Sequence, residues 1–200
     1  MITVSNVIYT THQNNIMVNS FLIEGKKVVF RYPKRYDLEG IWKFYNKAIR
    51  ESIAAGGNLS RHSKVTLKEE SKWLRTAIER IRKKESIYLL VEAEGEIVGS
   101  SSIDLGPEES GKHVGFFGIA LLESFTGIGI GTRLTKYIIE KARESLKIEI
   151  VRLNVFSNNI RAYKMYRNLG FHEIGRIKRG SKIKGRYSDD VIMVKYLKEK

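Results

Sequence analysis

The sequence predicts a mixed α/β fold built as one domain. Some segments alternate apolar and polar residues, as strands do, and others repeat apolar residues at the three- and four-residue spacing of a helix. The two kinds interleave in the order two strands, two helices, three strands, helix, strand, helix and two strands, which is typical of a sheet covered by helices. The 200 residues, 42% of them hydrophobic, are enough for one domain with a sizeable core, and no linker or repeat divides them.

The chain is expected to open with a strand hairpin and a helix. Residues 16–32 are predicted to form two strands around the turn Glu24-Gly25-Lys26, and Pro33 ends this unit. Asp37 can cap a helix that begins at Leu38, because a carboxylate accepts hydrogen bonds from the free N–H groups of a first helical turn. Residues 1–27 are assigned to an N-terminal extension of the domain that residues 28–200 form.

A second helix and a second hairpin follow. Thr66 and Glu69 have the spacing of a capping box, which predicts a helix over about 67–84. Two apolar runs on either side of Glu94-Gly95 predict a hairpin over residues 86–105. The helix is expected to bury Trp73, Leu74, Ala77, Ile78 and Ile81.

The second half of the chain alternates strands and helices. Gly170 is predicted to end a short helix, because glycine is the usual residue just past a helix C-terminus. A basic loop, residues 176–188, is expected to join the last two strands. The elements predicted here are strand 112–122, helix 129–146, strand 148–156, helix 158–170, strand 171–179 and strand 187–197.

The net charge of +14 permits a nucleic acid, an anionic surface or an acidic small molecule as partner. Lysine and arginine are nevertheless spread along the chain, with modest clusters at 80–84 and 176–186. Zinc-ligand spacing, heptads behind a basic region and the aromatic motif of single-strand RNA binders are all missing. No nucleic-acid partner is therefore expected.

The absence of cysteine excludes disulfides, thiolate metal sites and a cysteine nucleophile, and no metal is expected. No apolar run approaches the roughly 20 residues that cross a bilayer, so no membrane partner is expected. The N-terminal residues lack the charged-then-apolar order of a signal peptide. Together these features predict a cytoplasmic protein.

The stretch FTGIGIGTRL, residues 125–134, places three glycines at alternate positions before a predicted helix. A glycine-rich turn that opens a helix can hold an anion on its free N–H groups. A Walker loop would need Gly-Lys-Ser/Thr at its end, but Thr132 follows Gly131. A dinucleotide fingerprint would need glycine where Thr132 stands. A tightly packed turn without a ligand and a site for the pyrophosphate of coenzyme A are the other two interpretations.

Residues 118–142 and 148–176 resemble the GNAT superfamily of acyl-CoA-dependent N-acetyltransferases. The first family pattern, Gln/Arg-x-x-Gly-x-Gly/Ala, is matched by Gly129 and Gly131, whereas Thr126 stands where glutamine or arginine is usual. The second pattern is matched by Asn159, Ala162, Tyr166, Gly170 and Phe171. The resemblance extends over about 28–197. It implies a single domain with a mostly antiparallel, twisted sheet of about seven strands, flanking helices and a splayed central strand pair.

The resemblance also implies a site for acetyl-CoA as cosubstrate. The pantetheine arm would lie in the gap between strand 115–121 and the strand near 150–156, the pyrophosphate on the glycine turn, and Asn159 would bond the arm across the gap. Tyr166 would protonate the departing thiolate as the general acid. The cofactor-binding residues implied are Ile119, Ala120, Leu121, Thr126, Gly127, Ile128, Gly129, Ile130, Gly131, Thr132, Asn159, Tyr163 and Tyr166.

The general base is left open by the sequence. Many members of the superfamily carry a glutamate on the fourth strand of the fold, and Phe116 or Phe117 occupies that place here. Other acidic or imidazole side chains can take the proton directly or through water. The candidates are Glu92, Asp104, His113 and Asp190.

The expected reaction is acetyl transfer to the primary amine of a small, amino-acid-like or antibiotic-like molecule, by direct attack in a ternary complex. The acceptor site is expected between helix 38–50, loop 53–65 and the basic loop 176–188. Acetylation of a protein N-terminal or lysine amine, or a non-catalytic acyl-CoA-binding module, are the alternatives. Exposed sheet edges also allow a homodimer.

Overall fold

The computed structural model describes residues 19–23, 25–55 and 59–197, so residues 1–18 and Glu24 of the expected extension 1–27 lie outside the described range. These residues form one eight-stranded sheet with four α-helices, one strand more than the family resemblance implies. The strands are β1 (Asn19–Ile23), β2 (Lys26–Arg31), β3 (Ser86–Ala93), β4 (Glu96–Leu105), β5 (Val114–Leu121), β6 (Ile150–Phe156), β7 (His172–Ile183) and β8 (Arg186–Tyr196). The helices are α1 (Leu38–Ala54), α2 (Leu67–Arg82), α3 (Ile130–Leu146) and α4 (Ile160–Asn168).

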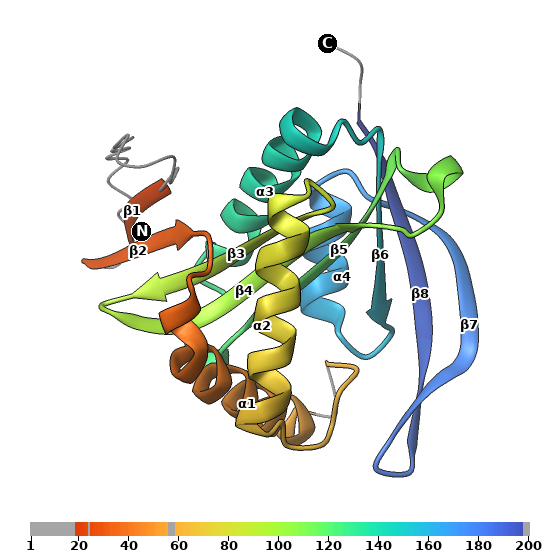
Figure 1. The fold of residues 1–200 in the computed structure, drawn as a ribbon. Coiled ribbons are helices and arrows are strands. Elements are labelled where there is room, and N and C mark those ends of the chain that lie inside the picture. The colour runs from red at the N-terminus through yellow and green to blue at the C-terminus, as the bar shows by residue number, and fades with distance from the viewer. Residues whose placement is uncertain (1–18, 24, 56–58, 198–200) are drawn as a thin grey trace.

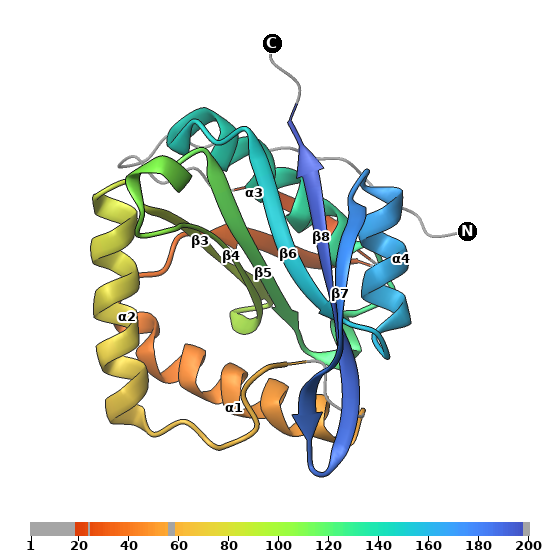
Figure 2. The same cartoon turned by 90° about the vertical axis from the view of Figure 1, so that its right-hand side faces the viewer.

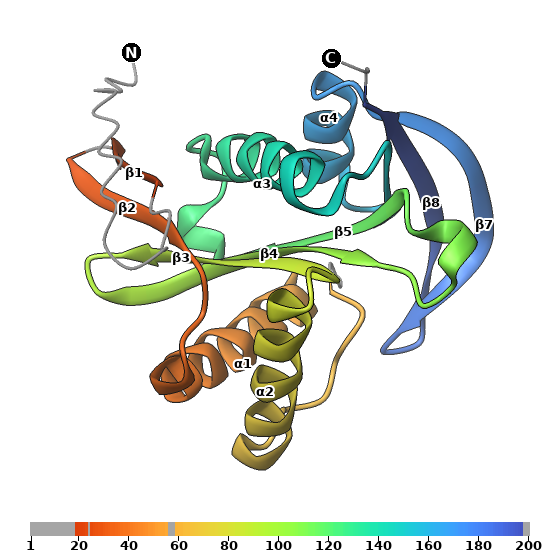
Figure 3. The same ribbon diagram turned by 45° about the horizontal axis from the view of Figure 1, so that its top comes forward.

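The strands lie in the order β1-β2-β3-β4-β5-β6-β8-β7, and every neighbouring pair except β5 and β6 is antiparallel. Helices α1 and α2 cover one face of the sheet, and α3 and α4 cover the other (Figure 3). The order of strands in the sheet follows the order in the chain from β1 to β6. The last two strands are exchanged, because β8 lies between β6 and β7 (Figure 1). The predicted α/β class, single sheet and element order are confirmed.

The core follows from the apolar patterns of the sequence. Strand β3 contributes a nearly continuous apolar run, and β4 adds buried apolar residues together with the buried Ser100 and Ser101, so that both strands are covered on both faces by the two helix layers. Helix α3 buries the stripe Ile130, Leu134, Ile138, Ala142 and Leu146 against the sheet, as its spacing predicts. None of the helices in the described part of the chain is long and apolar enough to cross a membrane.

Two local predictions about the first helices need correction. Asp37 precedes α1, but its carboxylate makes no cap bond to that helix. It accepts instead from the Lys34 N–H at 2.6 Å and, through both oxygens at 2.8 Å, from the Arg31 guanidinium. Trp73 is 40% exposed, because its ring packs edge-to-face on Tyr88 at a centroid distance of 4.9 Å at the rim of the core. The capping box of α2 is confirmed, and Thr66 accepts from the Glu69 N–H.

The prediction that residues 176–188 form a basic loop is wrong. Strand β7 continues to Ile183 and pairs with β8 almost to the tip, where Lys184 and Gly185 adopt positive φ angles. Figure 2 shows this hairpin extending past the other strands to the level of α1. Its residues remain in strand pairing, with a shift in register between Ile177 and Ser181, because cross-strand hydrogen bonding continues beyond the region where the sheet covers a core. The basic side chains therefore stand on a projecting two-stranded arm.

Candidate functional site

The predicted splay between β5 and β6 is present. The two strands pair in parallel only at Val114–Phe116 and Ile150–Arg152. Beyond this point β5 remains paired with β4 as far as Leu121, and β6 remains paired with β8 as far as Phe156. The two facing edges thus have no strand partner among the described residues, and β5 and β6 diverge (Figure 1). An extended ligand with amide groups can pair with such an edge as an added strand does.

A cavity of about 1280 Å³ occupies this gap and extends beyond it at both ends. One end reaches the turn before α3, and the other reaches α1 and the β7–β8 hairpin. The volume exceeds the roughly 300–1,000 Å³ that is common for one small ligand, so it has room for two substrates. Predicted site residues that line it are Ile119, Ala120, Leu121, Thr126, Gly127, Gly129, Gly131, Thr132, Asn159 and Tyr166.

The glycine turn is built as an anion site requires. Gly127 and Gly129 have φ angles of 77° and 91°, which L side chains rarely adopt. Gly129 is the N-cap of α3, so the first N–H groups of this helix end at the cavity without a side-chain cap. A Cβ at Gly131 would lie 3.3 Å from the Met165 sulfur, and glycine therefore leaves the cavity open there. Free amides and the positive end of the helix dipole suit a pyrophosphate group.

Thr126, at the first position of the turn, is held by a side chain of α4. The Arg161 guanidinium donates a hydrogen bond to the Thr126 hydroxyl and forms an ion pair of 2.8 Å with Glu123. All three side chains line the cavity, which places a guanidinium beside the glycine turn. Arg161 is a residue that sequence reasoning missed. Its signal was its place in the first turn of α4, two residues after Asn159.

Tyr166 lies on α4 with its ring enclosed and its surface contributing to the cavity wall. The residue is 5% exposed, and its ring packs edge-to-face on Phe117 at 5.9 Å and against Phe171 at 5.7 Å. Burial raises the pKa of the Tyr166 phenol, because a phenolate would lose its hydration. The hydroxyl therefore keeps its proton at neutral pH, as a proton donor must.

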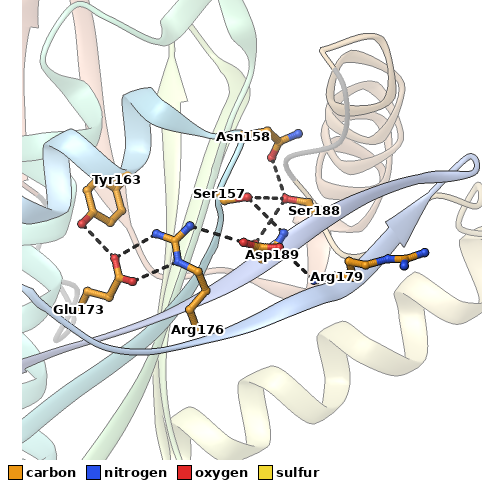
Figure 4. Close-up of polar contacts among 8 residues, drawn as sticks. All are labelled: Ser157, Asn158, Tyr163, Glu173, Arg176, Arg179, Ser188 and Asp189. Atoms are coloured by element: carbon orange, nitrogen blue, oxygen red, sulfur yellow. Dashed lines mark hydrogen bonds and ion pairs between the residues drawn. The ribbon is translucent and has the colours of Figure 1, made fainter.

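Three residues expected at the coenzyme site do not line the cavity. Ile130 is fully buried in the core, and Ile128 packs against that core. Tyr163 lies on another side of α4, where its hydroxyl donates to Glu173 at 3.0 Å (Figure 4). Figure 4 also shows that Glu173 pairs with Arg176, which reaches Asp189. Tyr163 thus takes part in a polar chain that connects α4 to β7 and β8. Asn159 lines the cavity, but its side chain caps α4 by accepting from the Ala162 N–H.

A model of the acetyltransferase (GNAT) family matches residues 54–171. The chain belongs to the GNAT family. The L-amino acid N-acetyltransferase AaaT of Escherichia coli is 30% identical over 118 residues, which cover 58% of this chain and 73% of that protein. The spermine/spermidine N(1)-acetyltransferase of Bacillus subtilis is 32% identical over 88 residues, 42% of this chain and 58% of the relative.

The solved structure of the ribosomal-protein-alanine N-acetyltransferase of Brucella melitensis is similar across the whole fold. It has a TM-score of 0.72 and 28% identity, with 84% of this chain and 99% of that one covered. The family match and these relatives make the chain an acetyl-CoA-dependent N-acetyltransferase. The implied fold and activity are confirmed. The site residues stay predictions.

The position where many GNAT enzymes carry a glutamate holds an aromatic ring in this chain. Phe116 lines the cavity, and the Arg152 guanidinium lies over its ring at 5.6 Å. Phe117 is buried against Tyr166. Neither ring can take a proton from an amine, so these two positions supply no general base.

Of the four candidate bases, one faces the cavity. Glu92 pairs with Arg31 at 2.7 Å, and Asp104 pairs with Arg80 at 2.9 Å. Neither of these carboxylates lines the cavity, and His113 does not line it. Asp190 on β8 does, at the end that α1 and the hairpin enclose.

The end of the cavity where the sequence places the acceptor site is lined by α1, the connection after it and the β7–β8 hairpin. Helix α1 contributes Ser52, the connection contributes His62, and the hairpin contributes Lys182 and Asp190. Both signs of charge therefore line this end. In the described part of the chain, no group of three or more histidine, aspartate or glutamate side chains is arranged to hold a metal ion.

Proposed function

We propose that this enzyme acetylates the primary amine of a small, amino-acid-like molecule by direct attack in a ternary complex. The observation that carries the proposal is the single cavity that joins the glycine turn of α3 to the enclosure between α1 and the β7–β8 hairpin. Because both ends open into the same β5–β6 gap, coenzyme and acceptor can be bound together. No covalent enzyme intermediate is needed, and the chain has no cysteine to form a thioester.

The residues fit acetyl-CoA. The glycine turn and the start of α3 would hold the pyrophosphate, with Arg161 beside them. The unpaired edge of β5 at Ile119–Leu121 would pair with the amides of the pantetheine arm. When bound, acetyl-CoA supplies the thioester. Backbone N–H groups of β5 would polarise its carbonyl, and the Tyr166 hydroxyl would give its proton to the sulfur.

The charges at the acceptor end support an amino acid as acceptor. The Asp190 carboxylate can bind an ammonium group, and the Lys182 ammonium, which lies over the Tyr187 ring at 5.0 Å in the free protein, can bind a carboxylate. Enclosure by α1 and the hairpin favours a molecule of a few heavy atoms over a folded protein surface. The similarity to an L-amino acid N-acetyltransferase agrees with this choice.

Titration of the protein with acetyl-CoA in a calorimeter is the first test, with ATP and NAD in parallel. Micromolar binding of acetyl-CoA alone is expected. A panel of the twenty L-amino acids, spermidine and a peptide with an N-terminal alanine would then be assayed for free thiol and for acetylated product by mass. Turnover of amino acids above the other two supports the proposal. Failure to bind acetyl-CoA, or turnover of none of them, overturns it.

A protein N-terminal amine is the second candidate, favoured by the similarity to the ribosomal-protein-alanine enzyme and by the projecting basic hairpin. The peptide in the panel separates it from the first candidate. The expectations of a cytoplasmic location and of a homodimer stay predictions, and light scattering at several protein concentrations tests the second.

A further inference from the structure

The Asp190 carboxyl group has an unusual place in the cavity wall. Its Oδ1 is buried and has no hydrogen-bond partner, the one such side-chain atom in the described part of the chain. Asp190 lies on β8 opposite Phe156 of β6, at the end of the ladder that borders the gap. Burying a carboxylate oxygen without a donor costs free energy, so native structures rarely leave one unless it has a use.

The preceding residue on β8, Asp189, shows that β7 can supply hydrogen-bond donors to a carboxylate. Asp189 accepts from the Arg179 N–H at 2.9 Å and lies 3.6 Å from the Arg176 guanidinium (Figure 4). Successive strand residues point to opposite faces, so Asp190 is directed away from these donors. Asp190 therefore lines the cavity from the face of β8 opposite to Asp189, and its Oδ1 is enclosed there without a donor.

Nearby cations are directed elsewhere. The Lys182 ammonium and the Arg179 guanidinium lie over the Tyr187 ring, at 5.0 Å and 3.9 Å from its centroid. No ion pair within 4.0 Å reaches Asp190 from any residue that the structure describes. The described lysine and arginine side chains of the β7–β8 hairpin therefore form no ion pair with the Asp190 carboxylate.

The backbone of β7 is fitted closely to this carboxylate. A Cβ at Gly180 would lie 2.8 Å from Asp190 Oδ2 and 3.1 Å from the Ile177 carbonyl oxygen. The register of β7 against β8 shifts between Ile177 and Ser181, which brings Gly180 over the aspartate. Any side chain at position 180 would displace the carboxyl group.

We propose that Asp190 is the residue that binds the acceptor's ammonium group and takes its first proton. The proposal rests on the proposed function, because it places the acceptor amine at this end of the cavity. An ammonium group at this end of the cavity supplies the hydrogen-bond donor that the Asp190 carboxyl group lacks. Asp190 accepts one proton from the nitrogen and passes it to solvent. The neutral amine forms the N–C bond to the acetyl carbonyl carbon as the C–S bond breaks. The thiolate takes the Tyr166 proton, the amide nitrogen releases its second proton to water, and Tyr166 is reprotonated from solvent.

The test compares Asp190→Asn with the matched control Asp104→Asn. Each substitution replaces one carboxylate by an amide of the same shape. Asp104, however, lies outside the cavity, where it forms an ion pair with Arg80. For the amino acid that the wild type acetylates best, we expect kcat/KM of Asp190→Asn to fall about 100-fold or more, the usual range for a lost acid–base group. The dissociation constant of acetyl-CoA should stay within about twofold, because the coenzyme end of the cavity is unchanged. The control should retain its kcat/KM.

Thermal unfolding gives a readout that needs no substrate. If the Asp190 carboxylate is unpaired in the free enzyme, Asp190→Asn should raise Tm by about 2–4 °C, since a neutral amide is less costly to bury.

Gly180→Ala should lower kcat/KM for the amine and leave acetyl-CoA binding intact. An Asp190→Asn enzyme with wild-type kcat/KM overturns the proposal, and so does one with a lowered Tm that no longer binds acetyl-CoA. Because wild-type turnover and acetyl-CoA binding test the proposed function separately, the two failures are distinguishable.

Discussion

Arg161 on α4 donates a hydrogen bond to the hydroxyl of Thr126, thirty-five positions earlier in the chain. The contact connects the two sequence motifs of the family, the glycine turn that begins at Thr126 and the α4 motif that begins at Asn159. Thr126 stands where the family pattern has glutamine or arginine. A guanidinium is therefore present beside the turn after all, but α4 supplies it and the turn does not.

Replacing Arg161 with alanine should weaken acetyl-CoA binding. A hydrogen bond to a charged group contributes about 1.5–3 kcal/mol, so Kd should rise about 10- to 100-fold. Calorimetric titration measures it. Arg143→Ala is the control, because Arg143 pairs with Glu140 on α3 and does not line the cavity. Equal Kd values for both variants and the wild type would contradict the assignment.

Contacts of this kind explain where sequence reasoning stops. The order of elements, the capping box of α2 and the glycine turn follow from local patterns, so they were predicted. The Arg161–Thr126 bond and the unpaired oxygen of Asp190 depend on which side chains the fold brings together, and no short pattern encodes that. The exposure of Trp73 is a tertiary effect of the same kind. Periodicity places this residue on the apolar side of its helix, but in the fold its ring packs edge-to-face on Tyr88 and stays 40% exposed.

Tyr166→Phe should lower kcat by about 100-fold or more and leave the fold intact. The phenylalanine ring fills the same space between Phe117 and Phe171, so only the proton donor is lost. Tyr163→Phe is the matched control, because that hydroxyl bonds Glu173 outside the cavity. Steady-state kinetics give kcat for both variants, and the two values are compared with that of the wild type. Similar kcat values for the two would remove Tyr166 from the general-acid role.

The pH profile gives a second check on Tyr166. Burial raises the pKa of this phenol above its ordinary value of 10.0, so the proton is retained up to and beyond that pH. The wild-type kcat should therefore show no loss between pH 7 and about pH 9 from phenol ionisation. A fall of kcat in that range, absent in Tyr166→Phe, would show that the phenol ionises too early to act as the acid.

Gly129→Ala should both destabilise the protein and weaken acetyl-CoA binding. No atom lies within 4 Å of the added Cβ, so the effect comes from the φ of 91° that alanine adopts at a cost of about 1–2 kcal/mol. Because this residue sets the direction of the first N–H groups of α3, strain relief would turn them away from the anion site. Gly175→Ala on β7 is the control, since its surroundings are equally open and its φ is not in the positive range. Tm and Kd for acetyl-CoA should change in the first variant alone.

The start of α2 should lose stability in acid through Glu69. Hydrogen bonds from the backbone and hydroxyl of Thr66 and from Arg61 lower the pKa of this carboxylate from 4.5 to about 2. A carboxylate with a lowered folded-state pKa stabilises the protein fully above its unfolded pKa. That contribution is lost as the pH falls from 4.5 through about 2, because the unfolded chain then binds the proton more readily.

Glu69→Gln separates this contribution from general acid unfolding. The free energy of unfolding, measured by urea titration, should be lower in the variant than in the wild type at pH 6. The difference should shrink steadily as the pH is lowered from 4.5 toward 2, since the wild-type carboxyl becomes a neutral group as well. Glu108→Gln, an exposed side chain between β4 and β5, should differ little from the wild type at either pH. A difference for Glu69→Gln that stays constant across this range would mean that the glutamine geometry, and not the lost charge, destabilises the cap.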